Sequence, residues 1–594
     1  MSGKRSVSWS AACGLLVVFG FATPVRAAAV PASATYLASA DRDAPATLIP
    51  PPSPHEDAKD RTAPATPAKP LRRTTCPPPA EFLTVSGFTS VQVNVDENGF
   101  NIVDDAANEP SIAIDPTNPD NIIIGWRQFD TIDSDFRQAG YGVSHDRGRT
   151  WVFPGSLAPG FFGSDPVLAA DADGVFYYMS IDFSECRLFR SFTAGDTWED
   201  YVQIVAAFRD KEWFTVDRTD GIGRGNLYTI WSDTNNFTRS TDGGLTWMTP
   251  MRIPLGTSPW GTIVVDPDGV VYACDRGFNV VRSFNAQDPN QQPEFTRTAT
   301  VDLGGTFPPY PGGAPNPGGL LAQPWIATDH STGPSRGNVY LLCSVNPPGE
   351  DTCDVRFARS TDQGATWTPS IRVNDDAPGA NAYQWFGALS VAPSGRLDAA
   401  WYDTRTTQDD GQSEVFYAYS TDAGDTWSPN VRVAPVFNSR IGWPRQNKIG
   451  DYIGAISDAA GMNLAYAATY NGEQDVYFVH IAPDCNGNGL HDGDDIASGR
   501  SRDADHDGVP DECAGVDCGA IDTFKVVCRN GVLKAKVRSS LPEGTLLTID
   551  NNGDRLTMTL DADGRGKVKW KQQTGAHTVS LLGCPNLDRE AQCG

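Results

Sequence analysis

The octapeptide STDAGDTW, at Ser420–Trp427, is one of five nearly identical phrases in this chain. The copies share the pattern S-x-D-x-G-x-T-W, and only the second departs from it, with Thr193 in place of the aspartate. A pattern with so many fixed positions does not recur this often by chance, so it indicates a repeat architecture. The other copies are SHDRGRTW (Ser144–Trp151), SFTAGDTW (Ser191–Trp198), STDGGLTW (Ser240–Trp247) and STDQGATW (Ser360–Trp367).

A second repeat, offset from the first, consists of a short apolar strand, a turn rich in Gly and Asp, and another strand. WGTIVVDPDGVVYACD, which begins at Trp260, is a clear copy. Turns such as D-P-D-G between alternating strands are typical of β-hairpins. The hairpins lie roughly 45–65 residues apart, a spacing that fits four-stranded propeller blades. The seven copies begin at Pro110, Asp165, Glu212, Trp260, Gln323, Phe386 and Gly450.

The octapeptide follows a third strand and precedes a fourth, so each blade is expected to run through strands A, B, C and D. EVFYAYS lies before Thr421 and NVRVAP lies after the same octapeptide. Within the turn the Ser and Asp side chains can bond to the backbone, the glycine allows a positive φ, and the Trp ring can pack between blades. The phrase is therefore interpreted as structural. The blade near Trp260–Ser283 and the last copy lack it.

The octapeptides resemble the Asp-boxes, or BNR repeats, of the sialidase-like β-propellers, and the resemblance covers about Phe82–Ile481. It implies an all-β fold, an Asp-box β-propeller, with its site around the central axis on the face opposite the A–B turns and the Asp-boxes. Sialidases have six blades. The seven hairpins favour seven blades here, and six stay possible if one copy is an insertion.

The resemblance also implies a chemistry. Sialidases hold the substrate carboxylate with three arginines, use a Tyr–Glu pair as nucleophile and an Asp as acid/base, and carry the first arginine in an Arg-Ile-Pro motif before the first Asp-box. This chain contains MRIP at Met251–Pro254, but Arg252 follows the third Asp-box, as Arg372 and Arg432 follow later ones. We therefore interpret Arg252 as a structural residue of a D strand.

Propeller topology places the ends of the B strands and the starts of the A strands on one face. Arginines there suit bidentate binding of carboxylate or sulfate, carboxylates suit acid/base work, and aromatic rings suit stacking on sugars. Alternatively, these residues cap loops and bridge blades. The catalytic candidates are Asp403, Tyr402, Tyr452, Glu212 and Asp451, and the substrate-binding candidates are Arg127, Arg276, Arg405, Arg445, Trp213 and Trp385. The same face collects Glu109, Asp165, Asp210, Lys211, Trp260 and Asp275.

Two functions of different classes follow. The first is an exported glycoside hydrolase of the sialidase type, an exo-sialidase acting on an acidic glycan or glycoprotein. The second is a non-catalytic propeller that binds a glycan or a protein and is tethered by modules at its C-terminal side. The missing Arg-Ile-Pro motif favours the second function, and the clustered Arg, Asp and Trp residues favour the first. The sequence leaves open whether the protein is an enzyme.

The N-terminal residues predict export. In residues 1–27, Lys4 and Arg5 precede the short apolar run Ala11–Ala22, and small residues stand at the cleavage positions, as in a secretory signal peptide. The run is too short for a membrane anchor. Residues 28–81 form a linker rich in Pro and Ala. We expect a secreted protein, extracellular or at a cell surface, without membrane insertion. The packed propeller is expected over 82–482.

The charge of the chain limits its partners. The formal net charge is -26 over 594 residues. Nucleic-acid binding needs a high density of Lys and Arg to neutralise phosphates, so no nucleic-acid partner is expected. Adhesion to anionic lipid is disfavoured for the same reason. An acidic chain of this kind is soluble and can attract cations.

Residues 483–514 predict a calcium-binding segment. DCNGNGLHDGDD resembles the calcium loops of EF-hands and dockerins, and DADHDGVPDEC resembles the shorter loops of thrombospondin type 3 repeats. Calcium takes six to eight oxygen ligands, which these side chains supply at the right spacing. The alternative is an acidic linker. A dockerin-like segment implies a cohesin-like or cell-surface partner. The candidate Ca²⁺ ligands are Asp484, Asn486, Asn488, Asp492, Asp495, Asp503, Asp505, Asp507 and Asp511.

Residues 515–594 differ from the rest of the chain. They alternate between apolar and polar positions and contain N-G and D-G turns, which predicts a small β-sandwich, and they are more basic than the rest. Cys518, Cys528, Cys584 and Cys593 could form two disulfides, which export makes plausible. Upstream, Cys343 and Cys353 could clip a loop.

Overall fold

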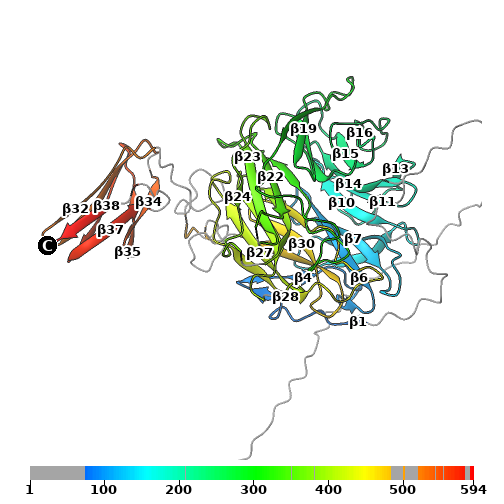
Figure 1. The fold of residues 1–594 in the computed structure, drawn as a ribbon, viewed down its shortest axis with the longest axis horizontal. Coiled ribbons are helices and arrows are strands. Elements are labelled where there is room, and N and C mark those ends of the chain that lie inside the picture. Colours follow the sequence, from blue (N-terminus) through cyan, green and yellow to red (C-terminus); the bar gives the residue numbers. More distant parts are fainter. Residues whose placement is uncertain are drawn as a thin grey trace, which may run out of the picture. The chain divides into compact units, whose positions relative to one another are not determined.

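The computed structural model describes residues 74–207, 209–349, 351–379, 382–407, 409–482, 495, 499–501, 520–541, 544–552, 554–581, 587 and 589–594. Nearly all regular structure in these residues is β-strand (Figure 1). A search of the same residues finds no helix long and apolar enough to cross a bilayer.

Seven antiparallel sheets follow one another along the chain, which confirms the predicted propeller and favours seven blades over six. In blade III a bridge between Phe237 and Met251 stands where a fourth strand would begin. Blade I consists of β6 (Ala106–Ile114), β7 (Ile122–Phe129), β8 (Gln138–Ser144) and β9 (Val152–Leu157); blade II of β10 (Ser164–Ala170), β11 (Phe176–Ile181), β12 (Cys186–Ser191) and β13 (Val202–Val205); and blade III of β14 (Asp210–Val216), β15 (Leu227–Ser232) and β16 (Phe237–Ser240). Blade IV consists of β17 (Trp260–Val265), β18 (Val271–Asp275), β19 (Asn279–Ser283) and β20 (Thr296–Thr300), and blade V of β21 (Trp325–Thr328), β22 (Val339–Val345), β23 (Asp354–Ser360) and β24 (Ile371–Arg372). Blade VI consists of β25 (Gln384–Val391), β26 (Leu397–Asp403), β27 (Gln412–Ser420) and β28 (Val431–Asn438), and blade VII of β29 (Gly454–Ser457), β30 (Met462–Ala468) and β31 (Asp475–Ile481).

The first strands of the blades form a closed ring. They contact one another in the order β6, β10, β14, β17, β21, β25, β29 and back to β6. Apolar clusters fill the spaces between neighbouring sheets, as between Tyr340 of blade V and Leu389 of blade VI. Because each sheet buries both faces against its neighbours, the strands read as apolar runs joined by polar turns.

An N-terminal strand completes the last blade. β4 (Val91–Gln92) pairs with β31, so blade VII combines segments from opposite ends of the propeller sequence. Figure 1 shows β4, in blue, beside the yellow strands of this blade. Asn94 extends the closure: its Nδ2 donates to Asp475 (2.6 Å), and its Oδ1 accepts from the amide of Val476 (2.9 Å). The sequence pattern did not predict this closure. Two small ladders lie nearby, β1 (Thr74–Thr75) with β5 (Asn101–Ile102) and β2 (Thr84–Val85) with β3 (Phe88–Thr89).

The closure is expected to weaken as pH rises. Burial raises the pKa of the Asp475 carboxyl from 3.8 to about 7, against the hydrogen bond from Asn94. Between about pH 4 and 7 the native protein retains a proton that the unfolded chain has released, so stability falls with rising pH and levels off above about 7. We predict that the melting temperature of Asp475→Asn relative to wild type rises by a few degrees between pH 5 and 8. A difference that is the same at both pH values would contradict this.

The Asp-box is the C–D turn that the sequence predicted. In the last copy the amide of Gly424 donates to Ser420 Oγ (2.9 Å), and the amide of Thr426 donates to Asp422 Oδ1 (2.9 Å). Gly424 has a φ of 89°, in the region that favours glycine. In the divergent copy Thr193 Oγ1 accepts the amide of Thr197 (2.9 Å), so a hydroxyl replaces the carboxylate in the same bond. The turn therefore tolerates this substitution.

Blade IV, one of the two blades that lack the octapeptide, keeps part of the turn. In blade IV, Ser283 Oγ accepts the amide of Ala286 (3.1 Å) and lies 3.0 Å from Asn285 Oδ1, as Ser and Asp do in the complete Asp-boxes. The shared element is therefore the serine-centred bond, which the octapeptide pattern alone does not reveal.

The C-terminal residues form a two-sheet sandwich. One sheet has the order β32-β33-β36, from β32 (Thr523–Arg529), β33 (Val532–Arg538) and β36 (Arg565–Lys571). The other has the order β35-β34-β37-β38, from β34 (Leu546–Asn551), β35 (Asp554–Thr559), β37 (Gly575–Leu581) and β38 (Arg589–Cys593). Both sheets contribute to one apolar core. A disulfide joins Cys528 and Cys593, whereas Cys343 and Cys353 are free and buried, so the predicted clip between them is wrong.

Candidate functional site

Five inner strands begin with a bulge that redirects side chains. The registers of β6, β10, β14, β17 and β25 are irregular at their first residues. One residue in each has a positive φ: Glu109, Asp165, Lys211, Trp260 and Phe386, between 48° and 56°. Non-glycine residues seldom adopt this conformation, and bulges of this kind re-aim side chains near functional sites. All five lie on the face opposite the Asp-boxes.

A buried charge cluster lies where these bulges and the loop before β29 meet. Lys211 Nζ lies 2.7 Å from Asp451 and 3.3 Å from Asp165. Lys448 Nζ lies 2.7 Å from Asp451 and 3.3 Å from Glu109. The side chain of Arg127 lies 3.2 Å from Glu109. We call these six residues the axial cluster, and each is at most 8% exposed.

The charges of the axial cluster depend on one another. Burial alone would lower the pKa of Lys211, but Asp165 and Asp451 raise it well above its usual value. Burial likewise opposes ionisation of Asp165, but Lys211 and Arg127 hold its pKa below the usual range. Burial dominates at Glu109 and raises its pKa. Ion pairing therefore outweighs burial at Lys211 and Asp165 and favours their charged forms, but it does not do so at Glu109.

A long connection between blades IV and V bonds to the loop before blade VII. The side-chain amide of Asn316 donates to the carbonyls of Gly450 (2.8 Å) and Leu320 (2.7 Å), and the amide of Leu320 donates to Asp451 (2.8 Å). The amide of Gly318 donates to the carbonyl of Asn447 (2.7 Å). These bonds tie the connection to the loop that carries Lys448 and Asp451, and the charged side chains of the axial cluster are shielded from solvent.

The predicted catalytic residues fall into two separate groups, and each is buried. Tyr452 donates to the carbonyl of Pro166 (2.9 Å) beside the axial cluster, which contains Asp451. Glu212 is 1% exposed, and burial raises its pKa well above the usual value. Tyr402 and Asp403 lie apart from them in blade VI. Tyr402 donates to the carbonyl of Ala467 (2.6 Å), and burial raises the pKas of both Tyr402 and Asp403.

The predicted substrate-binding residues are likewise dispersed. Arg405 pairs with Asp403 (2.8 Å) and Asp375 (2.5 Å). Trp385 packs against the ring of Tyr402, with centroids 4.7 Å apart, and Trp213 packs against Tyr452 at 5.4 Å. Two candidates remain exposed. Arg445 lies in the loop before β29, and Arg276 lies in a cleft of blade IV.

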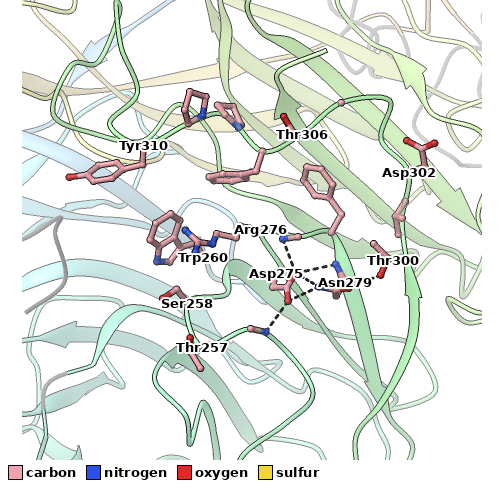
Figure 2. Close-up of a pocket in the computed structure, with 18 residues that line it drawn as sticks. Thr257, Ser258, Trp260, Asp275, Arg276, Asn279, Thr300, Asp302, Thr306 and Tyr310 are labelled. Carbon is pink, nitrogen blue, oxygen red and sulfur yellow. Dashed lines mark hydrogen bonds between the residues drawn. The ribbon is translucent and has the colours of Figure 1, made fainter. Parts of the chain in front are cut away.

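The blade IV cleft is an open cavity of about 900 Å³ on the predicted face (Figure 2). It lies at the start of β17 and the end of β18, and the connection from blade IV to blade V forms its other wall. Both apolar rings and hydroxyl groups line it. The side chains that line it include Thr257, Ser258, Trp260, Asp275, Arg276, Phe278, Asn279, Thr300, Asp302, Thr306, Phe307 and Tyr310.

Asp275 organises the floor of the cleft. Its carboxylate accepts hydrogen bonds from the amides of Gly256 (2.9 Å) and Gly277 (2.8 Å) and from the backbone and side-chain amides of Asn279 (2.9–3.1 Å). Figure 2 shows these bonds as dashed lines. Because both oxygens already accept several bonds, Asp275 holds the two loops rather than presenting a free carboxylate to a ligand.

Arg276 is the charged group of the cleft. Its guanidinium lies 4.2 Å from the centroid of the Trp260 ring, and its backbone amide donates to the carbonyl of Pro259 (2.6 Å). The rings of Phe307 and Tyr310 lie 6.1 Å and 6.4 Å from Trp260. Among the described residues Arg276 forms no ion pair, and its side chain is exposed. Cation–π contact with Trp260 therefore orients a guanidinium that is available to an anion.

Sequence reasoning named Arg276 and Trp260 for this face but missed the opposite wall. Phe307 and Tyr310 lie in GTFPPYPGGAPNPGG (Gly305–Gly319), which has no strand periodicity. The length of this loop and its aromatic residues between prolines could have indicated a wall of the site, because long loops in compact domains are often functional.

The calcium loops lie almost wholly outside the described residues. Of the predicted ligands only Asp495 is described: it is fully buried, and its carbonyl accepts the amides of Arg500 (3.0 Å) and Ser501 (3.1 Å). Calcium binding stays a prediction. In the remainder of the described chain no group of three or more His, Cys, Asp or Glu side chains is placed to hold a metal ion.

Comparison with known proteins finds no matching family model and no matching curated protein. Solved structures with a similar fold include a protein of unknown function from Dyadobacter fermentans DSM 18053 (14% identity, 66% of this chain, 98% of that chain, TM-score 0.36). They also include the Hadza microbial sialidase Hz136 (14% identity, 63% of this chain, 65% of that chain, TM-score 0.32). A third is a Penicillium chrysogenum alpha-L-arabinanase complexed with arabinobiose (13% identity, 69% of this chain, 98% of that chain, TM-score 0.33). At this similarity none of them assigns an activity to this chain.

Proposed function

We propose that the propeller binds an acidic glycan in the blade IV cleft and does not cleave it. The observation that carries the proposal is Arg276, an exposed guanidinium without an ion-pair partner among the described residues, held against Trp260 in an open cavity. By contrast, Arg127 and Arg405 on the same face are paired with carboxylates. A free guanidinium suits the carboxylate or sulfate of a sugar acid.

The remaining walls of the cleft suit a sugar ring. Phe307 and Tyr310 are partly exposed and supply apolar ring surface. Ser258 and Thr306 supply hydroxyl groups that can both donate and accept hydrogen bonds, and the Thr300 hydroxyl, which donates to Asn279 Oδ1 (2.6 Å), can still accept one. Carbohydrate sites combine a small number of placed polar groups with aromatic surface in this way. A cavity of about 900 Å³ has room for an oligosaccharide end.

The carboxylates of the cleft argue against hydrolysis there. Glycosidases that use two carboxylates need both groups to face the scissile bond. The lining contains Asp275 and Asp302. Both oxygens of Asp275 are occupied by hydrogen bonds from the loops, and Asp302 Oδ1 accepts the amide of Gly304 (2.8 Å). The cleft therefore offers an anion-binding group without a matched acid and base.

Hydrolysis of the sialidase type at the axial cluster is the second candidate, and one observation favours it. Neither carboxylate oxygen of Glu212 has a hydrogen-bond partner among the described residues, although the side chain is buried. Burial raises the pKa of Glu212 well above its usual value, which favours the protonated form that a general acid needs. This function requires the Gly305–Gly319 connection to move away from Gly450 and Asp451.

Binding of acidic glycans by the Arg276→Ala variant tests the first proposal. Loss of a charged hydrogen-bonding group is expected to weaken binding of sialylated or uronate-containing glycans about 10- to 100-fold. Arg276→Lys keeps the charge but not the planar fork, so its affinity should fall between those of wild type and Arg276→Ala. Arg252→Ala is the matched control, because Arg252 is exposed and lies outside the cleft.

The measurement is a glycan array followed by titration calorimetry of the best ligand. Equal affinities of wild type and Arg276→Ala would contradict the proposal. A loss of affinity in Arg252→Ala as large as that in Arg276→Ala would also contradict the proposal.

A further inference from the structure

The outer face of one sheet of the C-terminal sandwich is almost wholly basic. In β32, β33 and β36 the side chains alternate between the core and solvent. Apart from Thr523 and Val527, every exposed position of these strands is Lys or Arg, and none of the three strands contains Asp or Glu. We call this surface the basic sheet face, made up of Lys525, Arg529, Lys534, Lys536, Arg538, Arg565, Lys567, Lys569 and Lys571.

The register of the sheet brings these charges together. Lys536, in the central strand, lies directly opposite Lys525 on one side and Lys567 on the other. Lys534 lies opposite Lys569, and Arg538 lies opposite Arg565. Directly opposite residues on one face have Cβ atoms about 4.5–5.5 Å apart, and like charges at this distance destabilise a sheet. Such an arrangement disfavours folding unless an anion offsets it.

The charges are not neutralised within the described sandwich. In that part of the chain only Arg565 forms an ion pair among these nine residues, with Asp563 (3.2 Å), and both partners are exposed. The opposite side of the same sheet is firmly packed: Leu533, Trp570 and their neighbours lie in the core, and Cys528 is bonded to Cys593. The basic sheet face is therefore a rigid, open array of cations on a chain whose net charge is -26.

We propose that the basic sheet face binds a linear anionic polysaccharide, and so attaches the protein to a sulfate- or uronate-bearing polymer independently of the blade IV cleft. Exposed positions recur about every 7 Å along a strand and about 4.8 Å between strands, so a chain lying across the sheet meets several cations at once. Many weak contacts of this kind add up and release counterions, which makes the binding sensitive to salt.

The composition of the face favours a polysaccharide over other polyanions. It has no exposed aromatic residue, because Phe524 and Trp570 point into the core. Proteins that bind single-stranded nucleic acid stack bases on aromatic side chains, and readers of duplex DNA place a helix or a β-ribbon in a groove. Val527 is its only exposed apolar side chain, at 47%, whereas surfaces that enter a lipid interface carry a broad apolar face.

The test uses the full chain and heparin oligosaccharide as the probe. Lys536→Glu combined with Lys567→Glu is expected to weaken heparin binding at least about tenfold at about 50 mM salt, and raising the salt should weaken the wild type steeply. The matched control, Arg149→Glu combined with Arg252→Glu, changes the net charge equally at exposed propeller positions and should retain wild-type affinity. Arg276→Ala should also retain it, which separates this surface from the cleft.

Folding is checked by mapping the Cys528–Cys593 disulfide in each variant, and Lys534→Gln with Lys569→Gln is a milder second pair. Loss confined to the sandwich variants supports the proposal. Equal losses in both double variants, or no binding of heparin and polygalacturonate by wild type at the same low salt, would overturn it. Binding to vesicles that contain phosphatidylserine but to neither polysaccharide would also overturn it, in favour of a membrane surface.

Discussion

Lys211→Met is expected to destabilise the propeller by about 3–5 kcal/mol, because it removes one partner from a buried set of charges. Lys211 contacts Asp165 and Asp451, and these three residues come from blades II and III and from the loop before blade VII. Without the ammonium group, the buried carboxylate of Asp165 would lose the cation that lies 3.3 Å away. Methionine fills a similar volume, so lost charge rather than a cavity causes the effect.

Urea denaturation followed by near-ultraviolet circular dichroism measures this loss. Lys211→Arg retains the charge and should recover part of the stability. Lys525→Met, at an exposed position of the sandwich, is the control and should change stability by less than about 0.5 kcal/mol. If Lys211→Met and Lys525→Met unfold at the same urea concentration, the axial cluster does not hold the ring together.

Gly424→Ala is expected to have the second large effect, because the Asp-box glycine packs directly on the preceding blade. An added Cβ would lie 2.2 Å from the nearest ring carbon of Phe357, which is 1% exposed and cannot move freely. Overpacking of this kind costs about 1–3 kcal/mol or more, in addition to the cost of a positive φ.

Gly472→Ala separates the two contributions. Gly472 has a φ of 91°, close to that of Gly424, but no atom of the described residues lies within 4 Å of the point that an alanine methyl group would occupy. It should therefore report the backbone cost alone, about 1 kcal/mol. Thermal unfolding of both variants gives the comparison. Equal shifts would show that the Asp-box glycine serves only the turn and does not contribute to packing between blades.

Local features of the sequence predicted most of the fold. Asp-boxes and hairpin turns act within a few residues: in the D-P-D-G hairpin Asp266 accepts the amides of Asp268 and Val270 (both 2.9 Å), so the pattern and the structure correspond directly. β4 was not predictable in this way. It has two residues, and its partners Tyr477 and Phe478 are distant in the sequence, so neither length nor periodicity indicates the pairing.

The candidate site was predictable in its position but not in its composition. Topology alone places Arg276 and Trp260 on one face, because B strands end and A strands begin there. Which arginine stays unpaired depends on three-dimensional partners: Arg405 meets Asp375 across a loop, and Arg276 meets no carboxylate among the described residues. The wall formed by Phe307 and Tyr310 belongs to an irregular connection, whose course no periodic pattern reveals.

The proposal that the protein binds a glycan without cleaving it is tested most directly by measuring the binding and the cleavage of one acidic oligosaccharide in a single sample, with calcium present. After equilibrium dialysis, mass spectrometry of the bound and free fractions gives the affinity and the state of the sugar together. We predict that the oligosaccharide is bound, that its binding depends on Arg276, and that it is recovered intact after prolonged incubation. Release of the terminal sugar acid by wild type, abolished in Tyr452→Phe but retained in Arg276→Ala, would contradict this and place the chemistry at the axial cluster.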